Sequence, residues 1–153
     1  MLRRMPAIDI SQGRVTRTQS HIVVVMRFYP RFLPKDLRDE YIRELAPPDA
    51  LFKEFKERQR KLNNHNQAFD YVHYERRFTL TPAGLKQLAK FAELARTQDV
   101  VLVCQCRDFE RCHCDLLLLI ARARWGAEIR GPIFSYPEFE QRLAEGEFKA
   151  DAP

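Results

Sequence analysis

The sequence lacks an apolar segment long enough to cross a membrane as a helix. Its longest purely apolar run covers residues 116–121, whereas a spanning helix needs about 20 such residues. Arg3 and Arg4 lie near the N-terminus, but no apolar stretch follows them, so we expect no secretory signal. We therefore predict neither a membrane-spanning nor a secreted protein.

Cysteine is absent outside a single window, residues 104–114, which reads CQCRDFERCHC. A disulfide framework would place its cysteines across the whole chain. Clustered cysteines instead favour reduced thiols in a cytoplasmic setting. The window also contains a histidine, so it is the first candidate for chemistry.

The sequence has no block of lysine and arginine and no recognisable nucleic-acid-binding motif. Its formal net charge is +5 and its pI is about 9.2. This balance permits an anionic partner, either nucleic acid or a phosphorylated small molecule, but does not require one. Many basic residues alternate with acids, as in KEFKERQRK at 53–61, which is typical of a solvated helix face.

The chain of 153 residues is 45% apolar and 31% charged, which fits one globular domain with a core. Continuous apolar runs at 21–28 and 99–104 are typical of strands buried on both faces in a parallel sheet. We predict two further strands, an aromatic one at 69–75 and a short one at 127–129. Helical patterns cover residues 37–45, a segment from 49 onward, 82–95, 112–125 and 136–143.

This order of elements predicts a single three-layer α/β domain, with a mostly parallel sheet of about four strands and helices on both faces. We place the domain at residues 21–145, between an N-terminal arm over 1–20 that can be mobile and a C-terminal tail over 146–153. In such sheets, ligands bind outside the carboxyl ends of the strands. The segments expected at this edge are 27–31, 73–77, 104–114 and the one around Arg130.

Two cysteines of the window have positions that suit a reactive thiolate. Cys112 opens a predicted helix, where free N–H groups and the helix dipole lower the pKa of a thiol. Cys106 lies in the preceding loop, and Arg107 and Arg111 add positive charge. For both cysteines, a functional thiolate and a packing role remain open.

A phosphatase-type loop, in which an arginine stands six residues after the cysteine, is excluded. Position 110 is Glu and position 112 is Cys, so neither Cys104 nor Cys106 is followed by the required arginine. For Cys104 and Cys114, packing as small hydrophobic residues is the simpler interpretation.

A metal site is a less favoured alternative for the same window. Its residue types are suitable zinc ligands, since Zn²⁺ takes four from cysteine and histidine. The pairs are spaced C-x-C, however, whereas structural zinc sites favour C-x₂₋₄-C. If zinc is the cofactor, the ligands would be Cys104, Cys106, Cys112 and His113.

Arg27 and Arg31 follow the first apolar run and flank Tyr29 and Pro30. Two guanidinium groups at this position can grip a phosphate or a carboxylate. A solvent-exposed pair is the alternative, but Arg27 lies within an apolar run and needs a partner or an open edge.

His73 and Glu75 alternate along the predicted aromatic strand and would share one face. A carboxylate beside a histidine can orient it, and either group can carry a proton. The simpler interpretation is a surface pairing of Glu75 with Arg76 or Arg77.

The motifs resemble those of domain-of-unknown-function family 488. An arginine-containing, proline-bearing loop follows the first strand, an aromatic segment carries a histidine and a glutamate, a later strand ends in cysteine, and a Cys-His pair opens the next helix. The corresponding stretches are MRFYPRF (26–32), YVHYE (71–75), VVLVCQC (100–106) and RDFERCH (107–113), with ELAPPDALFKEF (44–55) resembling a shorter branch of the family.

The resemblance covers most of residues 21–131 and implies a compact α/β domain with a cysteine-centred pocket. It implies no particular reaction. The family's pattern continues Cys-His-Arg, whereas this chain has Cys114 in place of the arginine. An anion-binding role for that position is therefore in doubt, and Arg107 or Arg111 would have to substitute.

Two functions follow from these patterns. In the first, an enzyme or ligand-binding domain takes an anionic substrate, a nucleotide or a phosphate-bearing molecule. Its anion-binding residues would be Arg27, Arg31, Arg107 and Arg111, and its catalytic candidates would be Cys106, Cys112, His113, His73 and Glu75. In the second, a non-catalytic module binds nucleic acid or protein and holds its cysteines structurally or on zinc.

Overall fold

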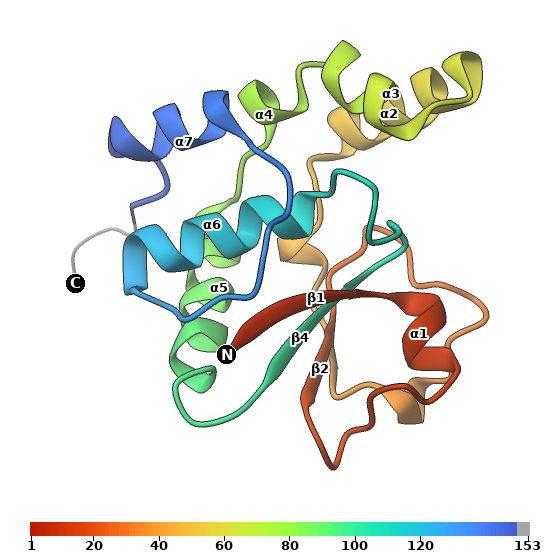
Figure 1. Cartoon of the computed structure of the whole chain (residues 1–153), viewed down its shortest axis with the longest axis vertical. Coiled ribbons are helices and arrows are strands. Elements are labelled where there is room, and N and C mark those ends of the chain that lie inside the picture. Colours follow the sequence, from red (N-terminus) through yellow and green to blue (C-terminus); the bar gives the residue numbers. More distant parts are fainter. Residues whose placement is uncertain (150–153) are drawn as a thin grey trace.

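In the computed structural model, which describes residues 1–149, four strands form one parallel sheet in the order β1-β4-β2-β3 (Figure 1). The strands are β1 (Leu2–Pro6), β2 (His21–Val24), β3 (Glu40–Tyr41) and β4 (Val100–Cys104). Every pairing in the sheet is parallel. The predicted α/β class with a parallel sheet is therefore confirmed.

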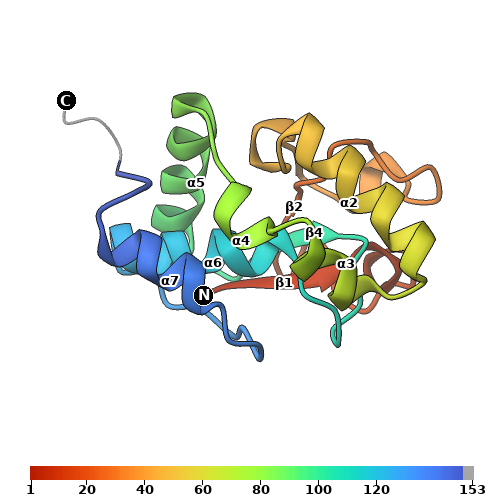
Figure 2. The same cartoon turned by 90° about the horizontal axis from the view of Figure 1, so that it is seen from above.

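Seven α-helices and two 3₁₀ helices connect or flank these strands within residues 1–149. They are α1 (Ala7–Ser11), η1 (Lys35–Leu37), η2 (Arg43–Leu45), α2 (Asp49–Leu62), α3 (His65–Tyr71), α4 (Tyr74–Arg77), α5 (Pro82–Leu94), α6 (His113–Trp125) and α7 (Pro137–Ala144). Figure 2 shows the path from α2 through α3 and α4 to α5. Among the described residues, no helix has the length and apolar character needed to cross a membrane.

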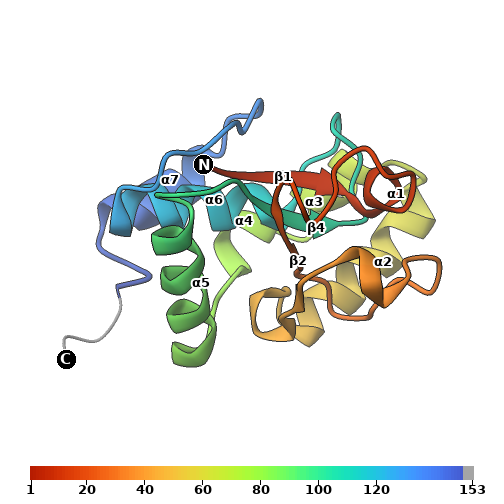
Figure 3. The same cartoon turned by 90° about the horizontal axis from the view of Figure 1, so that it is seen from below.

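Alternation along the strands divides the core into two layers. In β4, Leu102 and Cys104 face the larger cluster, which is built with α2 to α7, whereas Val101 and Val103 face the smaller one. The smaller cluster includes residues of α1, which lies beyond the carboxyl end of β1 (Figure 3). Because both faces of β4 are covered, all of its residues are buried, as its continuous apolar run predicts.

The predicted N-terminal arm is wrong, because residues 2–6 form β1 at one edge of the sheet. Leu2 is fully buried, and the terminal amino group of Met1 donates to the carbonyl of Ala95 at 2.6 Å. A five-residue strand that contains two adjacent arginines has no apolar run. Its pairing with β4 is a long-range contact that local periodicity does not reveal.

The predicted strand at 69–75 is also wrong, because this segment forms the end of α3 and the start of α4. Ala68, Phe69 and Val72 are buried together, at helical spacing. The rings of Phe69 and Tyr74 stack with centroids 4.3 Å apart. Aromatic content favours a strand, but burial of these rings on one helical face outweighs that preference.

Two further differences concern short elements. The region 37–45, predicted to be helical, contains part of η1, strand β3 and η2. The expected strand at 127–129 is reduced to a single bridge between Leu2 and Ile129. The other four predicted helices are confirmed as α2, α5, α6 and α7.

The predicted C-terminal tail begins with ordered contacts. The ring of Phe148 lies 5.2 Å from that of Phe139, measured between centroids, and Glu147 pairs with Arg142. Residues 146–149 therefore pack against α7. The rest of the predicted tail, 150–153, lies outside the described residues.

Candidate functional site

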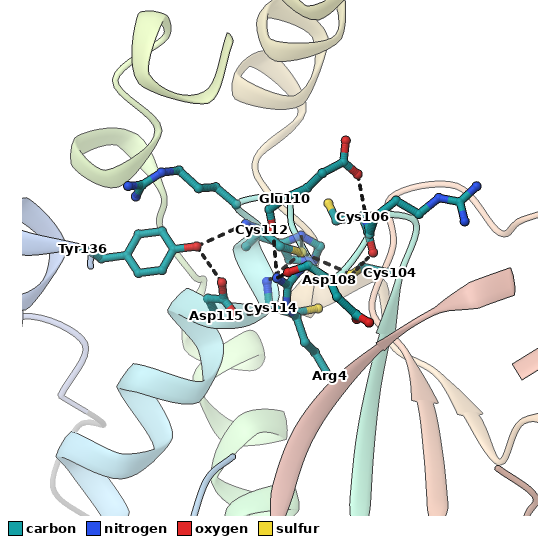
Figure 4. A network of polar contacts seen from close by, with 12 residues as sticks. Arg4, Cys104, Cys106, Asp108, Glu110, Cys112, Cys114, Asp115 and Tyr136 are labelled. Carbon is teal, nitrogen blue, oxygen red and sulfur yellow. Dashed lines mark hydrogen bonds and ion pairs between the residues drawn. The ribbon is translucent and has the colours of Figure 1, made fainter. Parts of the chain in front are cut away.

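The cysteine window connects the carboxyl end of β4 to the start of α6 (Figure 4). Cys104 is the last residue of β4, and Cys112 is the N-cap of α6. The Sγ atom of Cys112 accepts a hydrogen bond from the backbone N–H of Cys114 at 3.4 Å. The cap therefore directs free N–H groups of the helix toward this sulfur, which favours its thiolate form.

Three thiols meet at the start of α6. The sulfur atoms of Cys112 and Cys104 lie 3.1 Å apart. The sulfurs of Cys104, Cys112 and Cys114 all lie within 4.8 Å of one another, and all three residues are buried. Cys106 is half-buried and hydrogen-bonds to Cys104 and Cys112, but it is not one of the three grouped sulfurs that define this cluster. The structure thus brings Cys114, which sequence analysis assigned to packing alone, into the same group as Cys112.

His113 connects the start of α6 to the residue that follows β2. Its Nε2 lies 2.8 Å from the carbonyl oxygen of Val25, and its Nδ1 lies 3.8 Å from the sulfur of Cys112. Because a carbonyl oxygen only accepts hydrogen bonds, Nε2 must carry a proton. In the neutral ring, Nδ1 is then an acceptor that faces the Cys112 thiol.

The surroundings of Cys112 stabilise its thiolate. Burial by itself would raise the pKa of Cys112, but hydrogen bonds from the neighbouring thiols and the charge of His113 outweigh burial and lower this pKa well below its usual range. Hydrogen bonding to Cys104 and Cys112, together with burial, raises the pKa of Cys106. Burial also raises the pKa of Cys114. Of Cys106, Cys112 and Cys114, Cys112 is therefore the one whose surroundings favour the thiolate.

A buried polar network holds the start of α6 in place. The backbone N–H of Cys112 donates to the Tyr136 hydroxyl at 3.3 Å, and that hydroxyl donates to Asp115 Oδ2 at 2.5 Å. Arg4 Nε lies 3.0 Å from the other oxygen of Asp115 (Figure 4). Burial raises the pKa of the Asp115 carboxyl to about 6, although Arg4 and Tyr136 oppose the shift.

Arg4 also holds the loop that precedes Cys112. Its Nη2 donates to the carbonyl of Glu110 at 2.8 Å and to that of Asp108 at 3.3 Å. His65 supports the same loop from α3, since its Nε2 donates to the carbonyl of Arg111 at 2.7 Å. These contacts define the backbone path that places Cys112 beside Cys104.

A cavity of about 620 Å³ lies over this cluster, at the carboxyl edge of the sheet. Its wall includes the segment that follows β2, the facing side of α2 and the cysteine window. Arg27 is anchored there by a hydrogen bond from its Nε to the carbonyl of Pro47 at 3.1 Å. The guanidinium of Arg111 lies over the ring of Tyr136, 5.1 Å from its centroid.

Most of the predicted site residues gather at this cavity. Its lining includes Cys106, Cys112, His113, Arg27, Arg31, Arg107 and Arg111. His73 and Glu75 do not line it. The side chain of His73 is exposed, and its backbone has φ 55° at the start of α4. Glu75 accepts a hydrogen bond from the backbone N–H of Phe139 at 3.1 Å, so it supports α7 instead.

Sequence analysis missed Arg4, Asp115 and Tyr136. Arg4 was assigned to an arm, and Tyr136 to the start of a helix with no role at the site. Asp115 offered a signal, because it is an acid next to the apolar run 116–121 inside a predicted buried helix. Such an acid requires a buried partner, but the sequence does not identify that partner.

Comparison with known families gives a match over most of the chain. The model of the family described as the active DUF488-N3 subclade matches residues 8–124. Comparisons with curated proteins and with solved structures each returned no match. The matched span contains β2, β4, the whole cysteine window and nearly all of α6. The chain therefore belongs to domain-of-unknown-function family 488, within its active N3 subclade.

Proposed function

We propose that this protein is an enzyme that uses Cys112 as a thiolate nucleophile toward an anionic, phosphate-bearing substrate. The observation that carries the proposal is the pairing of Cys112 with His113 at the base of a cavity lined by cations. An activated thiol requires a base within reach and a site beside it for the substrate. His113 lies within reach of the Cys112 sulfur, and the cavity beside them offers a site for the substrate.

The proposed role of His113 is that of general base. In the resting pair the Cys112 thiol has already given its proton to Nδ1, the nitrogen that can take it while Nε2 donates to Val25, so a thiolate stands beside a charged imidazolium. The sulfur then attacks the substrate's electrophilic atom with its electron pair, and the bond to the leaving group breaks. The proton on Nδ1 passes to that leaving group, so that charge and atoms balance.

The anionic character of the substrate follows from the charges around the cavity. Its lining has Arg27, Arg31 and Lys56 on one side, and Arg107 and Arg111 on the other. Guanidinium groups bind phosphate through paired hydrogen bonds, and clustered charge attracts anions from solution.

Alkylation with reagents of different charge tests this proposal. Iodoacetate is an anion and iodoacetamide is neutral, so cations around Cys112 should favour iodoacetate. We expect the rate ratio of iodoacetate to iodoacetamide at Cys112 to exceed that of glutathione by about tenfold at low salt. This preference should decline as salt rises, because the Debye length is only about 10 Å at 0.1 M. Mass spectrometry assigns the modified residue.

Two lysines of α2 supply matched variants. Lys56 lines the cavity, whereas Lys53 is exposed outside it and pairs with Asp49 at 3.0 Å. Lys56→Gln should lower the iodoacetate preference, and Lys53→Gln should leave it unchanged, although both remove one positive charge. Equal effects of the two variants would show that net charge rather than the cavity determines the preference, and would contradict the proposal.

Zinc binding is a second candidate function, favoured by the grouping of the sulfurs of Cys104, Cys112 and Cys114 within 4.8 Å. Thiolates are good zinc ligands, and three protein ligands leave a position for water or substrate. Arg4 would balance the negative charge of three thiolates around one Zn²⁺. A zinc-bound Cys112 is not a free nucleophile, so the two functions exclude each other.

Metal analysis of protein purified without an affinity tag separates the two candidates. Zinc binding predicts about one equivalent of zinc per chain, lost in Cys114→Ser and retained in Cys106→Ser, because Cys106 lies outside the cluster. The nucleophile proposal predicts substoichiometric zinc in the wild type. Retention of zinc in Cys114→Ser would exclude the three-sulfur site.

A further inference from the structure

Two phenylalanine rings are exposed beside the catalytic candidates. Phe28 is 62% exposed and Phe32 is 48% exposed, and both line the cavity from the segment that follows β2. The ring of Phe28 lies 5.8 Å from that of Phe52 on α2, measured between centroids, and Phe52 lines the cavity as well. Exposed apolar surface of this kind, gathered at a cavity, favours a ligand that covers it.

The cations that surround these rings have no carboxylate partner. Within residues 1–149, none of the five cavity cations, Arg27, Arg31, Lys56, Arg107 and Arg111, forms an ion pair with a carboxylate. Glu110 is the acid on the lining, and it is already engaged by the backbone N–H of Arg107 and by His65.

Pairing is common elsewhere on the surface, which makes the unpaired cations informative. Arg76 pairs with Glu138 and Arg77 pairs with Glu54, although all of these side chains are largely solvated. The cavity is thus a place where positive charge and aromatic surface meet without carboxylate partners from the protein.

We propose that the substrate is a nucleotide unit, with its base stacked against Phe28 and Phe32 and its phosphate held by Arg27, Arg31 and Lys56. Stacking on aromatic rings beside cations that hold the phosphate is the general mode by which proteins bind unpaired bases. Small-molecule sites occupy about 300–1,000 Å³, and a cavity of about 620 Å³ suits one nucleotide. A duplex would first have to unpair and flip out a base to offer it to these rings, which costs a few kcal/mol.

This inference rests on the proposed function and names its substrate class. Cys112 and His113 line the same cavity as Phe28 and Phe32, so a bound nucleotide would lie over the thiolate. The unit has two sources with the same chemistry, a free nucleotide and the 5′-phosphorylated end of a single strand.

Calorimetric titration of the full chain with adenosine 5′-monophosphate and with ribose 5-phosphate tests whether the base is recognised. Both ligands carry the same sugar phosphate, so a difference between their affinities measures the contribution of the adenine base. We expect the nucleotide to bind at least about tenfold more tightly, as one stacked base would provide. A 5′-phosphorylated single-stranded tetranucleotide is titrated in parallel, and whichever nucleotide ligand binds more tightly identifies the source.

Alanine variants provide the matched control. Phe28→Ala and Phe32→Ala should each weaken nucleotide binding by about tenfold and leave ribose 5-phosphate unaffected. Tyr71→Ala should change neither affinity, because Tyr71 is 57% exposed on α3 and does not line the cavity. All three side chains are exposed, so these variants should fold normally.

Equal affinities for the two small ligands, no binding of any nucleotide, or no effect of either phenylalanine variant would overturn the inference. The proposed function has a separate readout, since alkylation of Cys112 requires no ligand. If Cys112 is reactive but the base is not recognised, the proposed nucleophile stands and the nucleotide inference is wrong. If the base is recognised but Cys112 is unreactive, the cavity binds a nucleotide and Cys112 is not the nucleophile.

Discussion

The alkylation rate of Cys112 by iodoacetamide is expected to rise much less between pH 6 and pH 8 than that of a free thiol. A free thiol has a pKa of about 8.5, so its thiolate fraction and its alkylation rate rise by roughly a hundredfold over this range. The pKa of Cys112 is lowered well below its usual range, against the effect of burial, by the neighbouring thiols and His113. Its thiolate therefore persists to lower pH than that of a free thiol, and its alkylation rate falls less steeply.

The absolute rate at pH 6 should exceed that of a free thiol by on the order of tenfold. The gain in thiolate fraction is partly offset because a thiolate of lower pKa is a weaker nucleophile. Site-resolved mass spectrometry is the measurement. Cys106 and Cys114 have raised pKa values and serve as internal controls, since they should remain unmodified at pH 6.

Cys112→Ser should abolish the fast reaction, and His113→Gln should shift it to higher pH, because the charge of His113 lowers the pKa of Cys112. A rate for Cys112 that rises with pH as steeply as that of glutathione would contradict the assignment of this residue as the nucleophile.

Arg4→Met is expected to destabilise the protein by about 3–5 kcal/mol at pH 8, the usual cost of removing one partner from a buried ion pair. The side chains of Arg4 and Asp115 are only 11% and 2% exposed. Methionine fills a similar volume but leaves the Asp115 carboxylate without a counter-charge. Urea denaturation measures the loss as a change in the free energy of unfolding.

The destabilisation should become smaller at pH 5. The pKa of Asp115 is about 6 in the folded protein, above its unfolded value of about 3.9. The folded state therefore binds the extra proton, and the cost of the buried charge is present above the folded pKa and is relieved as the pH falls through it. Removal of Arg4 raises the folded pKa further, so protonation offsets more of the loss.

Arg3→Met is the matched control on the same strand. Arg3 pairs with Asp99 at 2.8 Å, but the two side chains are 19% and 23% exposed, so water screens the pair. Its loss should cost less than that of Arg4. Equal costs at pH 8, or a cost for Arg4→Met that does not depend on pH, would show that the network around Asp115 does not carry the stability assigned to it.

The parts of the site that sequence analysis located correctly depend on local pattern. The apolar run at 99–104 predicts a buried strand, so Cys104 is placed at its end. The apolar residues that follow Cys112 predict a helix that begins there, and Gly126 ends this helix in the left-handed region. The rule that sites lie at the carboxyl edge of a parallel sheet then brings Arg27 to the same place.

The predictions for His73 and Glu75 depended on the face of a strand that each side chain would occupy. His73 and Glu75 would share a face on a strand, but His73 is exposed in the turn before α4, whereas Glu75 lies within α4 and accepts a hydrogen bond from α7. The aromatic composition of this segment suits both a strand and a buried helix. The segment is helical because its rings pack against Phe55 and Tyr136, and local propensity does not take such long-range contacts into account.

The sequence by itself determined the α/β class, the strand–loop–helix that carries the cysteines and the positive charge near them, because each is encoded in short-range periodicity and composition. Only the tertiary structure decided that Cys114 joins Cys104 and Cys112, and that Arg4 balances Asp115 across more than a hundred residues. A buried charge or thiol derives its properties from neighbours that are distant in the chain, and folding alone brings those neighbours together.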